Sequence, residues 1–110
     1  MKLNEIQKFC RQLLAKVSYP RIGTIIGLQE ELGKLAEEVM NIEIYGKPFD
    51  KNKLEKKCSE VFFSFIDLCN SYDVELDQIS IDRVNEIKKK INQWEIEHGS
   101  ILQDKRKKLD

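Results

Sequence analysis

Apolar residues recur at every third or fourth position along most of this chain, a spacing typical of helices that bury one face. Leu28, Leu32 and Leu35, for example, are followed at the same spacing by Val39 and Ile42. Turn-forming residues separate one periodic segment from the next. The pattern therefore predicts helices over residues 3–17, 24–45, 51–72 and 81–98.

Capping and stop signals mark the ends of these predicted helices. Thr24 and Asp50 are of residue types that cap helix N-termini, because their side-chain oxygens accept hydrogen bonds from free backbone N–H groups. Gly46 and Pro48 stop the second helix, and Gly99 is a natural stop for the fourth. Neither a linker nor a repeat divides the chain. We therefore predict one helical domain over residues 1–98 and a charged tail over residues 99–110.

The helix predicted over residues 51–72 carries more apolar residues than a single buried face requires. Placed at about 100° per residue, they occupy more than half of the circumference, so this helix needs neighbours on more than one side. They are Leu54, Cys58, Val61, Phe62, Phe63, Phe65, Ile66, Leu68, Cys69 and Tyr72. Short connections favour antiparallel neighbours. The predicted fold is all-α, a four-helix antiparallel bundle completed by formation of a homodimer or a higher homo-oligomer.

Composition removes several classes of partner. The chain has 110 residues, and its 19 Lys plus Arg balance 19 Asp plus Glu. Proteins that bind bulk nucleic acid or a membrane surface need a basic excess, so this balance argues against both. Without an apolar run of membrane-spanning length or a secretory signal, the protein is expected to be cytoplasmic. Cys10, Cys58 and Cys69 lie in apolar patterns, and we expect buried, reduced thiols.

Polar residues form one stripe on each of the two middle helices. On the second helix the stripe consists of Glu31, Lys34, Glu38, Asn41 and Tyr45, whereas Glu30 and Glu37 point away from it. On the third helix it consists of Lys53, Lys57, Glu60, Ser64, Asp67 and Ser71. One interpretation is that both stripes are simply solvated faces. If instead they face one cleft, Glu31, Lys34, Lys57 and Glu60 converge.

Such a convergence would suit phosphate chemistry. Carboxylates bind Mg²⁺, a hard cation that takes oxygen ligands and often bridges protein carboxylates to substrate phosphates. Lys88 and Asn92 share a face of the fourth predicted helix, where both can donate hydrogen bonds to phosphate. These features are nonspecific when each is taken alone.

Residues 27–38, GLQEELGKLAEE, resemble the signature helix of the MazG-like, all-α nucleoside triphosphate pyrophosphohydrolases, whose usual form is EELGELAE. The stretch from Glu60 to Leu76 is similar to the continuation of that family, and residues 84–92 are similar to its last helix. The resemblance covers residues 24–94. It implies cleavage of a nucleoside triphosphate into a nucleoside monophosphate and pyrophosphate, with Mg²⁺ held by a Glu-x-x-Glu and a Glu-x-x-Asp pair.

Carried over residue by residue, the resemblance implies that Glu31 and Glu60 hold the metal while Lys88 and Asn92 contact the nucleotide. The other two metal positions depart from the family, because Lys34 and Lys57 stand where it has glutamates. A protonated lysine offers no lone pair to a metal and can instead neutralise a neighbouring carboxylate. The sequence therefore predicts a degenerate member with a partly lost metal site.

Three alternatives remain open from the sequence. A shifted metal site would use Glu38 and Asp67, each two helical turns from Glu31 and Glu60, respectively. Lys34 and Lys57 could instead bind nucleotide phosphates directly, without a metal. In the third alternative the scaffold is a noncatalytic protein-interaction module. Mg²⁺ is the expected cofactor only if the chain is an active enzyme.

Overall fold

The computed structural model describes residues 1–17 and 19–109, with side chains for all of these except residues 102, 103 and 105–109. Within these ranges the chain forms four helices and no strand, which confirms the all-α class. The helices are α1 (Leu3–Leu13), α2 (Ile22–Glu43), α3 (Lys51–Ser71) and α4 (Leu76–Leu109). The chain divides into two compact units, Met1–Leu76 and Asp77–Asp110. A bundle that contains all four helices, and its completion by a second copy, stay predictions.

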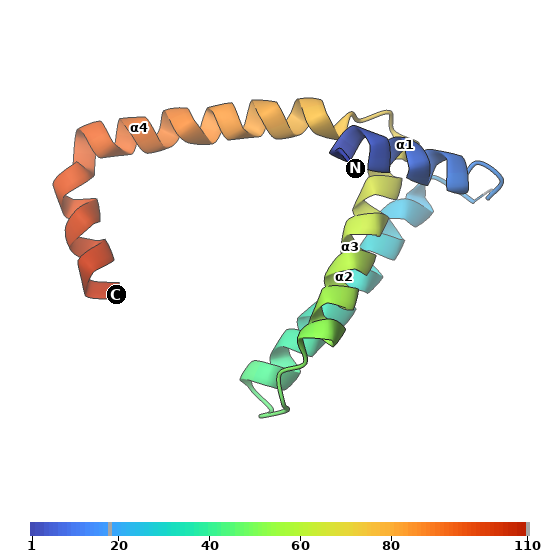
Figure 1. The fold of residues 1–110 in the computed structure, drawn as a ribbon, viewed down its shortest axis with the longest axis horizontal. Helices are drawn as coiled ribbons and strands as arrows, with labels where there is room; N and C mark the ends of the chain where they lie inside the picture. The colour runs from blue at the N-terminus through green and yellow to red at the C-terminus, as the bar shows by residue number, and fades with distance from the viewer. Residues whose placement is uncertain (18, 110) are drawn as a thin grey trace. The chain divides into compact units, whose positions relative to one another are not determined.

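Helices α2 and α3 form an antiparallel hairpin in the first unit, and α1 packs against α3 (Figure 1). The hairpin connection contains Gly46 with a φ of 67°, a left-handed conformation that costs glycine little. Asp50 then caps α3, since its side chain accepts a hydrogen bond from the Lys53 backbone N–H at 3.2 Å. The predicted cap at Asp50 is therefore confirmed.

A small core joins α1 to the C-terminal end of α3. It contains Cys10, Ile66, Cys69 and Leu76, all buried. Beside them lies Gln7, whose Nε2 donates to the Val74 carbonyl at 2.6 Å while its Oε1 accepts from the Leu76 N–H at 3.0 Å. These bonds satisfy backbone groups of the segment that follows α3, where no helix ladder is available to pair them.

Three local predictions in this unit are wrong. Helix α1 ends at Leu13 and not at residue 17, because residues 14–16 form a turn. Thr24 is not an N-cap: α2 already begins at Ile22, and the buried Thr24 hydroxyl donates to the Arg21 carbonyl at 2.8 Å. Cys58 is exposed, while the other two cysteines are buried. Cys58 is thus solvent-accessible although its helix is rich in apolar residues.

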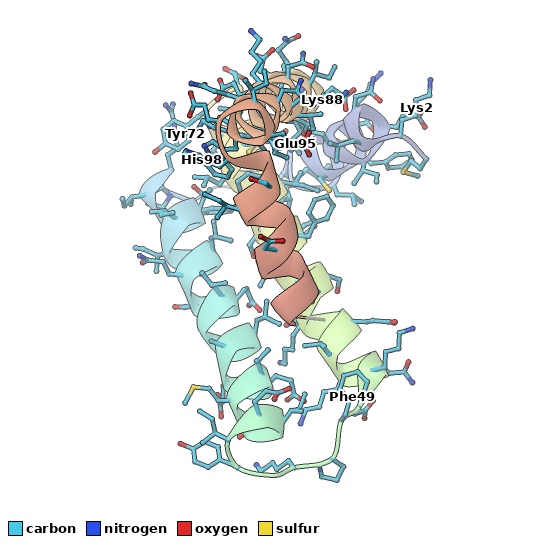
Figure 2. All side chains as sticks on the ribbon, turned by 90° about the vertical axis from the view of Figure 1, so that its left-hand side faces the viewer. Lys2, Phe49, Tyr72, Lys88, Glu95 and His98 are labelled. Atoms are coloured by element: carbon cyan, nitrogen blue, oxygen red, sulfur yellow. The ribbon has the colours of Figure 1, made fainter. Side chains whose placement is uncertain are left out.

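Helix α4 is longer than the sequence pattern indicated. It begins at Leu76, and the chain is helical on both sides of His98, where φ of −138° and ψ of 18° break the helical geometry. Gly99 was predicted to end the helix, and this is wrong: the interruption lies one residue earlier and the helix resumes after it. Side chains stand out all around this helix, and each residue from 78 to 98 is exposed (Figure 2).

Among the described residues, no helix combines the length and the apolar character that a membrane span requires.

Candidate functional site

Six of the polar residues that the sequence singled out on α2 and α3 form ion pairs within or between these two helices. We call the set Glu31, Lys34, Glu38, Lys53, Lys57 and Glu60 the α2–α3 polar seam. Glu31 and Lys34 are one helical turn apart on α2, and the Lys34 Nζ lies 3.6 Å from the Glu31 Oε1. On α3, the Lys57 Nζ lies 3.8 Å from the Glu60 Oε2. Both ion pairs follow directly from the spacing of three residues on a helix.

A third pair connects the two helices. The Glu38 side chain is only 7% exposed, and its Oε2 lies 3.3 Å from the Nζ of Lys53, whose side chain is 57% exposed. A carboxylate removed from water needs a counter-charge, and the flexible lysine stem supplies one from the neighbouring helix. Every glutamate of the seam therefore has a lysine partner.

Lys34, Glu38 and Lys57 share one small pocket of about 200 Å³ at this contact, together with Lys53, Asn41 and Glu37. The structure thus brings together five members of the two predicted stripes, whereas Glu31 and Glu60 do not line this pocket. Glu37, which the helical pattern placed away from this face, also lines the pocket. Each of the three lysines that line it is paired with a glutamate of the seam, so the pocket has no strong excess of either charge.

The residues of the seam do not fit a Mg²⁺ site. Mg²⁺ requires several oxygen ligands in near-octahedral geometry, whereas ammonium groups occupy the space beside Glu31 and Glu60. The shifted set does not converge either, because Glu38 is paired with Lys53 and Asp67 lines a different pocket. Across residues 1–17 and 19–109, no three acidic, histidine or cysteine side chains come together as metal ligands.

One oxygen of the seam departs from this pattern of paired charges. The Oε2 of Glu31 is buried, and no hydrogen-bond partner for it is found in the described part of the chain. The Lys34 ammonium lies against the other oxygen of the same carboxylate. A buried acceptor without a donor is costly, so this oxygen is the place in the seam where an additional positive or donor group would be most favourable.

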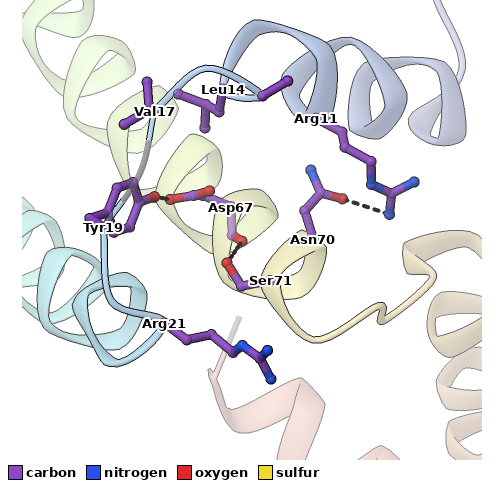
Figure 3. Close-up of a pocket in the computed structure, with 9 residues that line it drawn as sticks. Arg11, Leu14, Val17, Tyr19, Arg21, Asp67, Asn70 and Ser71 are labelled. Carbon is purple, nitrogen blue, oxygen red and sulfur yellow. Dashed lines mark hydrogen bonds between the residues drawn. The ribbon is translucent and has the colours of Figure 1, made fainter.

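Asp67 belongs to a second and larger pocket, of about 530 Å³, that we call the arginine pocket (Figure 3). Its polar walls come from α1, α3 and the segment between α1 and α2. They are formed by Arg11, Tyr19, Arg21, Asp67, Asn70 and Ser71. The Tyr19 hydroxyl donates to Asp67 Oδ2, and the Arg11 Nη2 donates to Asn70 Oδ1 at 3.2 Å.

Burial raises the pKa of two groups in this part of the first unit. Partial burial raises the pKa of Asp67, because desolvation disfavours the carboxylate. The pKa of Cys10 is also raised, first by burial and then by the charge of Asp67. The Arg21 guanidinium lies 5.3 Å from the centre of the Tyr72 ring, which is a cation–π contact.

The sequence missed this pocket for a definite reason. Arg11 lies on the polar face of α1, and Arg21 directly precedes α2, so neither belongs to a periodic stripe. They line one pocket with Asp67 because separate elements come together there: Arg11 comes from α1, Arg21 from the segment before α2, and Asp67 from α3. Lys88 and Asn92 lie on α4 in the second unit and line neither pocket. Their predicted contact with a nucleotide stays a prediction.

Comparisons with models of protein families, with curated proteins and with solved structures find no match for this chain. The resemblance to the MazG-like family therefore depends on the motif and the spacing alone.

Proposed function

We propose that this chain is a noncatalytic protein of the MazG-like type, which keeps the helical scaffold and uses it as a protein-interaction module. The observation that carries the proposal is the pairing of each glutamate in the α2–α3 polar seam with a lysine. In the family that the sequence resembles, the equivalent positions concentrate four acids. Here Lys34 and Lys57 replace two of them.

Electrostatics supports the loss of metal-dependent catalysis. Acids that converge without a cation repel one another, so a metal bound there relieves a strain. Glu31 and Glu60 already lie within 4 Å of an ammonium group, and a divalent cation would have to displace that group or bind beside it. Both routes weaken metal binding at the positions that the family uses.

Exposed apolar residues support an interaction role. Phe62, Phe63 and Phe65 on α3 are all exposed, as are Leu32 and Val39 on α2. Large apolar side chains gathered on two adjacent helices are typical of surfaces that meet another protein. This surface belongs to the same hairpin whose polar side is closed by the three ion pairs.

One observation favours a second candidate, the Mg²⁺-dependent nucleoside triphosphate pyrophosphohydrolase that the resemblance implies. The buried Oε2 of Glu31 has no partner among the described residues, and a cation is one group that could satisfy it. This candidate predicts that Glu31 is essential for turnover, whereas the noncatalytic proposal predicts no turnover at all.

Pyrophosphate release from a panel of nucleoside triphosphates, with Mg²⁺ or Mn²⁺, separates the two candidates. We expect no release by the wild type. The variant Lys34→Glu/Lys57→Glu restores the four acids and should bind Mn²⁺ at least about tenfold more tightly than the wild type in a calorimetric titration. Lys51→Glu/Lys56→Glu is the matched control, because it changes the charge equally at exposed positions of α3 outside the seam.

Robust wild-type turnover that is abolished by Glu31→Ala would overturn the noncatalytic proposal and establish the hydrolase. Equal Mn²⁺ binding by the seam variant and its control would remove the argument that the two lysines block the metal site. Nucleotide binding by the wild type without turnover, lost in Lys34→Ala/Lys57→Ala, would replace the interaction role with metal-free phosphate binding.

A further inference from the structure

Helix α4 carries an apolar row with the spacing of a coiled coil. Val84, Ile87, Ile91 and Trp94 follow one another at steps of three, four and three residues, and Ile101 follows Trp94 after one further heptad. All five are exposed, Trp94 to 55%. A row this narrow and this regular corresponds to positions a and d of a heptad, where one helix packs along a single partner helix.

The charges that flank this row are separated by sign along the helix. Arg83, Lys88 and Lys90 flank its N-terminal half, at the positions called e and g, and Glu95 and Glu97 flank its C-terminal half. Figure 2 labels Lys88 and Glu95 on this helix. Among the described side chains, neither of these two residues nor Lys90 forms an ion pair, so their charges are available to a partner.

This separation of charge makes the helix complementary to a reversed copy of itself. When Ile91 of one copy packs against Trp94 of an antiparallel second copy, Lys88 lies opposite Glu95 of that copy. In the same register Lys90 lies opposite Glu97, and the twofold symmetry produces each pair twice. All four flanking contacts then join opposite charges.

Other arrangements of two copies are less favourable. An in-register parallel pair places Arg83 beside the second copy's Lys88, twice, and this repulsion offsets the two attractive Lys90–Glu95 contacts. The antiparallel register in which Ile87 faces Ile91 places Lys88 against Lys88 and Lys90 against Lys90, which offsets the two attractive Arg83–Glu97 contacts. Charge complementarity therefore selects the antiparallel register in which Ile91 faces Trp94.

We propose that the apolar row of α4 is a self-association surface, and that its occupant is α4 of a second copy of this chain in that register. The inference names a partner for the proposed interaction module and so rests on the proposed function. The heptad spacing continues through His98 to Ile101. Straightening of the helix at His98 would therefore lengthen the paired segment and bring Asp104 opposite the second copy's Arg83.

Sedimentation equilibrium of the full chain over a range of concentrations tests the surface. The wild type is expected to dimerise. Lys88→Glu/Lys90→Glu makes all four flanking charges of the paired segment acidic, and Glu95→Lys/Glu97→Lys makes them all basic. Each variant should raise the dimer dissociation constant by about a hundredfold. The far-face variant Lys89→Glu should leave it unchanged.

Complementation makes the test specific. The fourfold variant with both exchanges restores opposite pairs and should dimerise within about tenfold of the wild type. A mixture of the acidic and basic variants should form heterodimers. Disulfide cross-linking tests the antiparallel orientation of the two α4 helices, in a Cys58→Ser background that removes the exposed native thiol. Chains with Ile87→Cys mixed with chains with His98→Cys should form a disulfide under mild oxidation. Chains with Ile91→Cys alone should cross-link poorly.

A wild type that stays monomeric at about 100 μM, a concentration at which weak dimers still form, overturns the inference. The apolar row would then be covered by the same chain or by another protein. Efficient joining of Ile91→Cys chains, or a fourfold variant as weak as either twofold one, overturns the antiparallel register. None of these outcomes concerns pyrophosphate release, so failure of this inference and failure of the noncatalytic proposal are distinguishable.

Discussion

The two units of this chain use the same helical period in opposite circumstances. In the unit Met1–Leu76, α3 has neighbours, and Ile66 is buried to 1% exposure between α1 and the segment that follows α3. In the unit Asp77–Asp110, the apolar row of α4 has an equally regular spacing, yet Ile87 stays 46% exposed. An amphipathic pattern therefore specifies a helix with an apolar face, and that face becomes part of a core only where another element packs against it.

Charged residues differ between the units in a parallel way. In the α2–α3 polar seam, acids and bases alternate at a spacing of one turn and neutralise each other within the chain. Along α4, the flanking charges are grouped by sign, and Lys88, Lys90 and Glu95 form no ion pair among the described side chains. Local alternation closes a surface to charged partners, whereas segregation of charge over a helix makes it selective for a complementary surface.

The largest effect is expected where the comparison is most direct, between Ile66 and Ile87. Ile66→Ala should lower the free energy of unfolding by about 3 kcal/mol, because it leaves a cavity in a small core. Ile87→Ala should change it by less than about 0.5 kcal/mol at a low protein concentration, where the face of α4 is solvated. Urea unfolding measures both. Losses of equal size would show that α4 is packed as tightly as α3.

A substitution of Gln7 tests how firmly the segment after α3 is held against α1. Gln7→Ala removes both bonds to the Val74–Leu76 segment and leaves a buried N–H and carbonyl unpaired, so we expect a loss of about 2 kcal/mol. Hydrogen exchange of the Leu76 amide should accelerate at the same time. Gln12→Ala, at an exposed position of α1, is the control and should leave both measurements unchanged.

The ion pair between α2 and α3 should contribute less. Lys53→Met leaves the buried Glu38 carboxylate without its counter-charge, and we expect about 1 kcal/mol of destabilisation, a reduced value because Lys53 itself is mostly exposed. Lys51→Met breaks the exposed pair with Glu55 and should cost less than about 0.5 kcal/mol. If thermal unfolding shows the same loss of stability for both variants, the burial of Glu38 does not strengthen its ion pair with Lys53.

The smallest effect concerns Asp67 and pH. Its pKa is raised in the folded state by desolvation, so the folded chain binds this proton more readily than the unfolded chain. The ionised side chain therefore lowers stability, and this cost appears as the pH rises above the unfolded value of 3.8. Asp67→Asn should raise Tm by about 1–2 °C at neutral pH, with the difference vanishing in acid. If the difference in Tm between the variant and the wild type instead grew in acid, the pKa of Asp67 would be lowered and not raised in the folded state.

Most of the helical architecture could be predicted from the sequence, because helices depend on spacing within a few residues. The class, the existence of each helix and the cap at Asp50 all follow from local rules. The end of α1 and the interruption at His98 could not be read in this way. At His98 the backbone leaves the helix although the neighbouring residue types, including Gly99, gave a signal for a helix end rather than for a kink.

The candidate site divides along the same line. The pairs Glu31–Lys34 and Lys57–Glu60 each lie on one helix, so the interval of three residues was sufficient to predict them. The pairing of Glu38 with Lys53 and the meeting of Arg11 with Asp67 in one pocket join separate elements. They depend on which helix packs against which, and periodicity on a single helix does not specify that.

By itself, the sequence determined that this protein is helical, that its charges balance, and that Lys34 and Lys57 each stand three residues from a glutamate. Only the tertiary structure decided that Glu38 is buried against Lys53, that Arg11 and Arg21 line one pocket with Asp67, and that the row on α4 lies exposed. The physical reason is the distance along the sequence between the residues that interact. Interactions within one helical turn are fixed by the order of residues, whereas burial and long-range contacts arise only when separate helices come together.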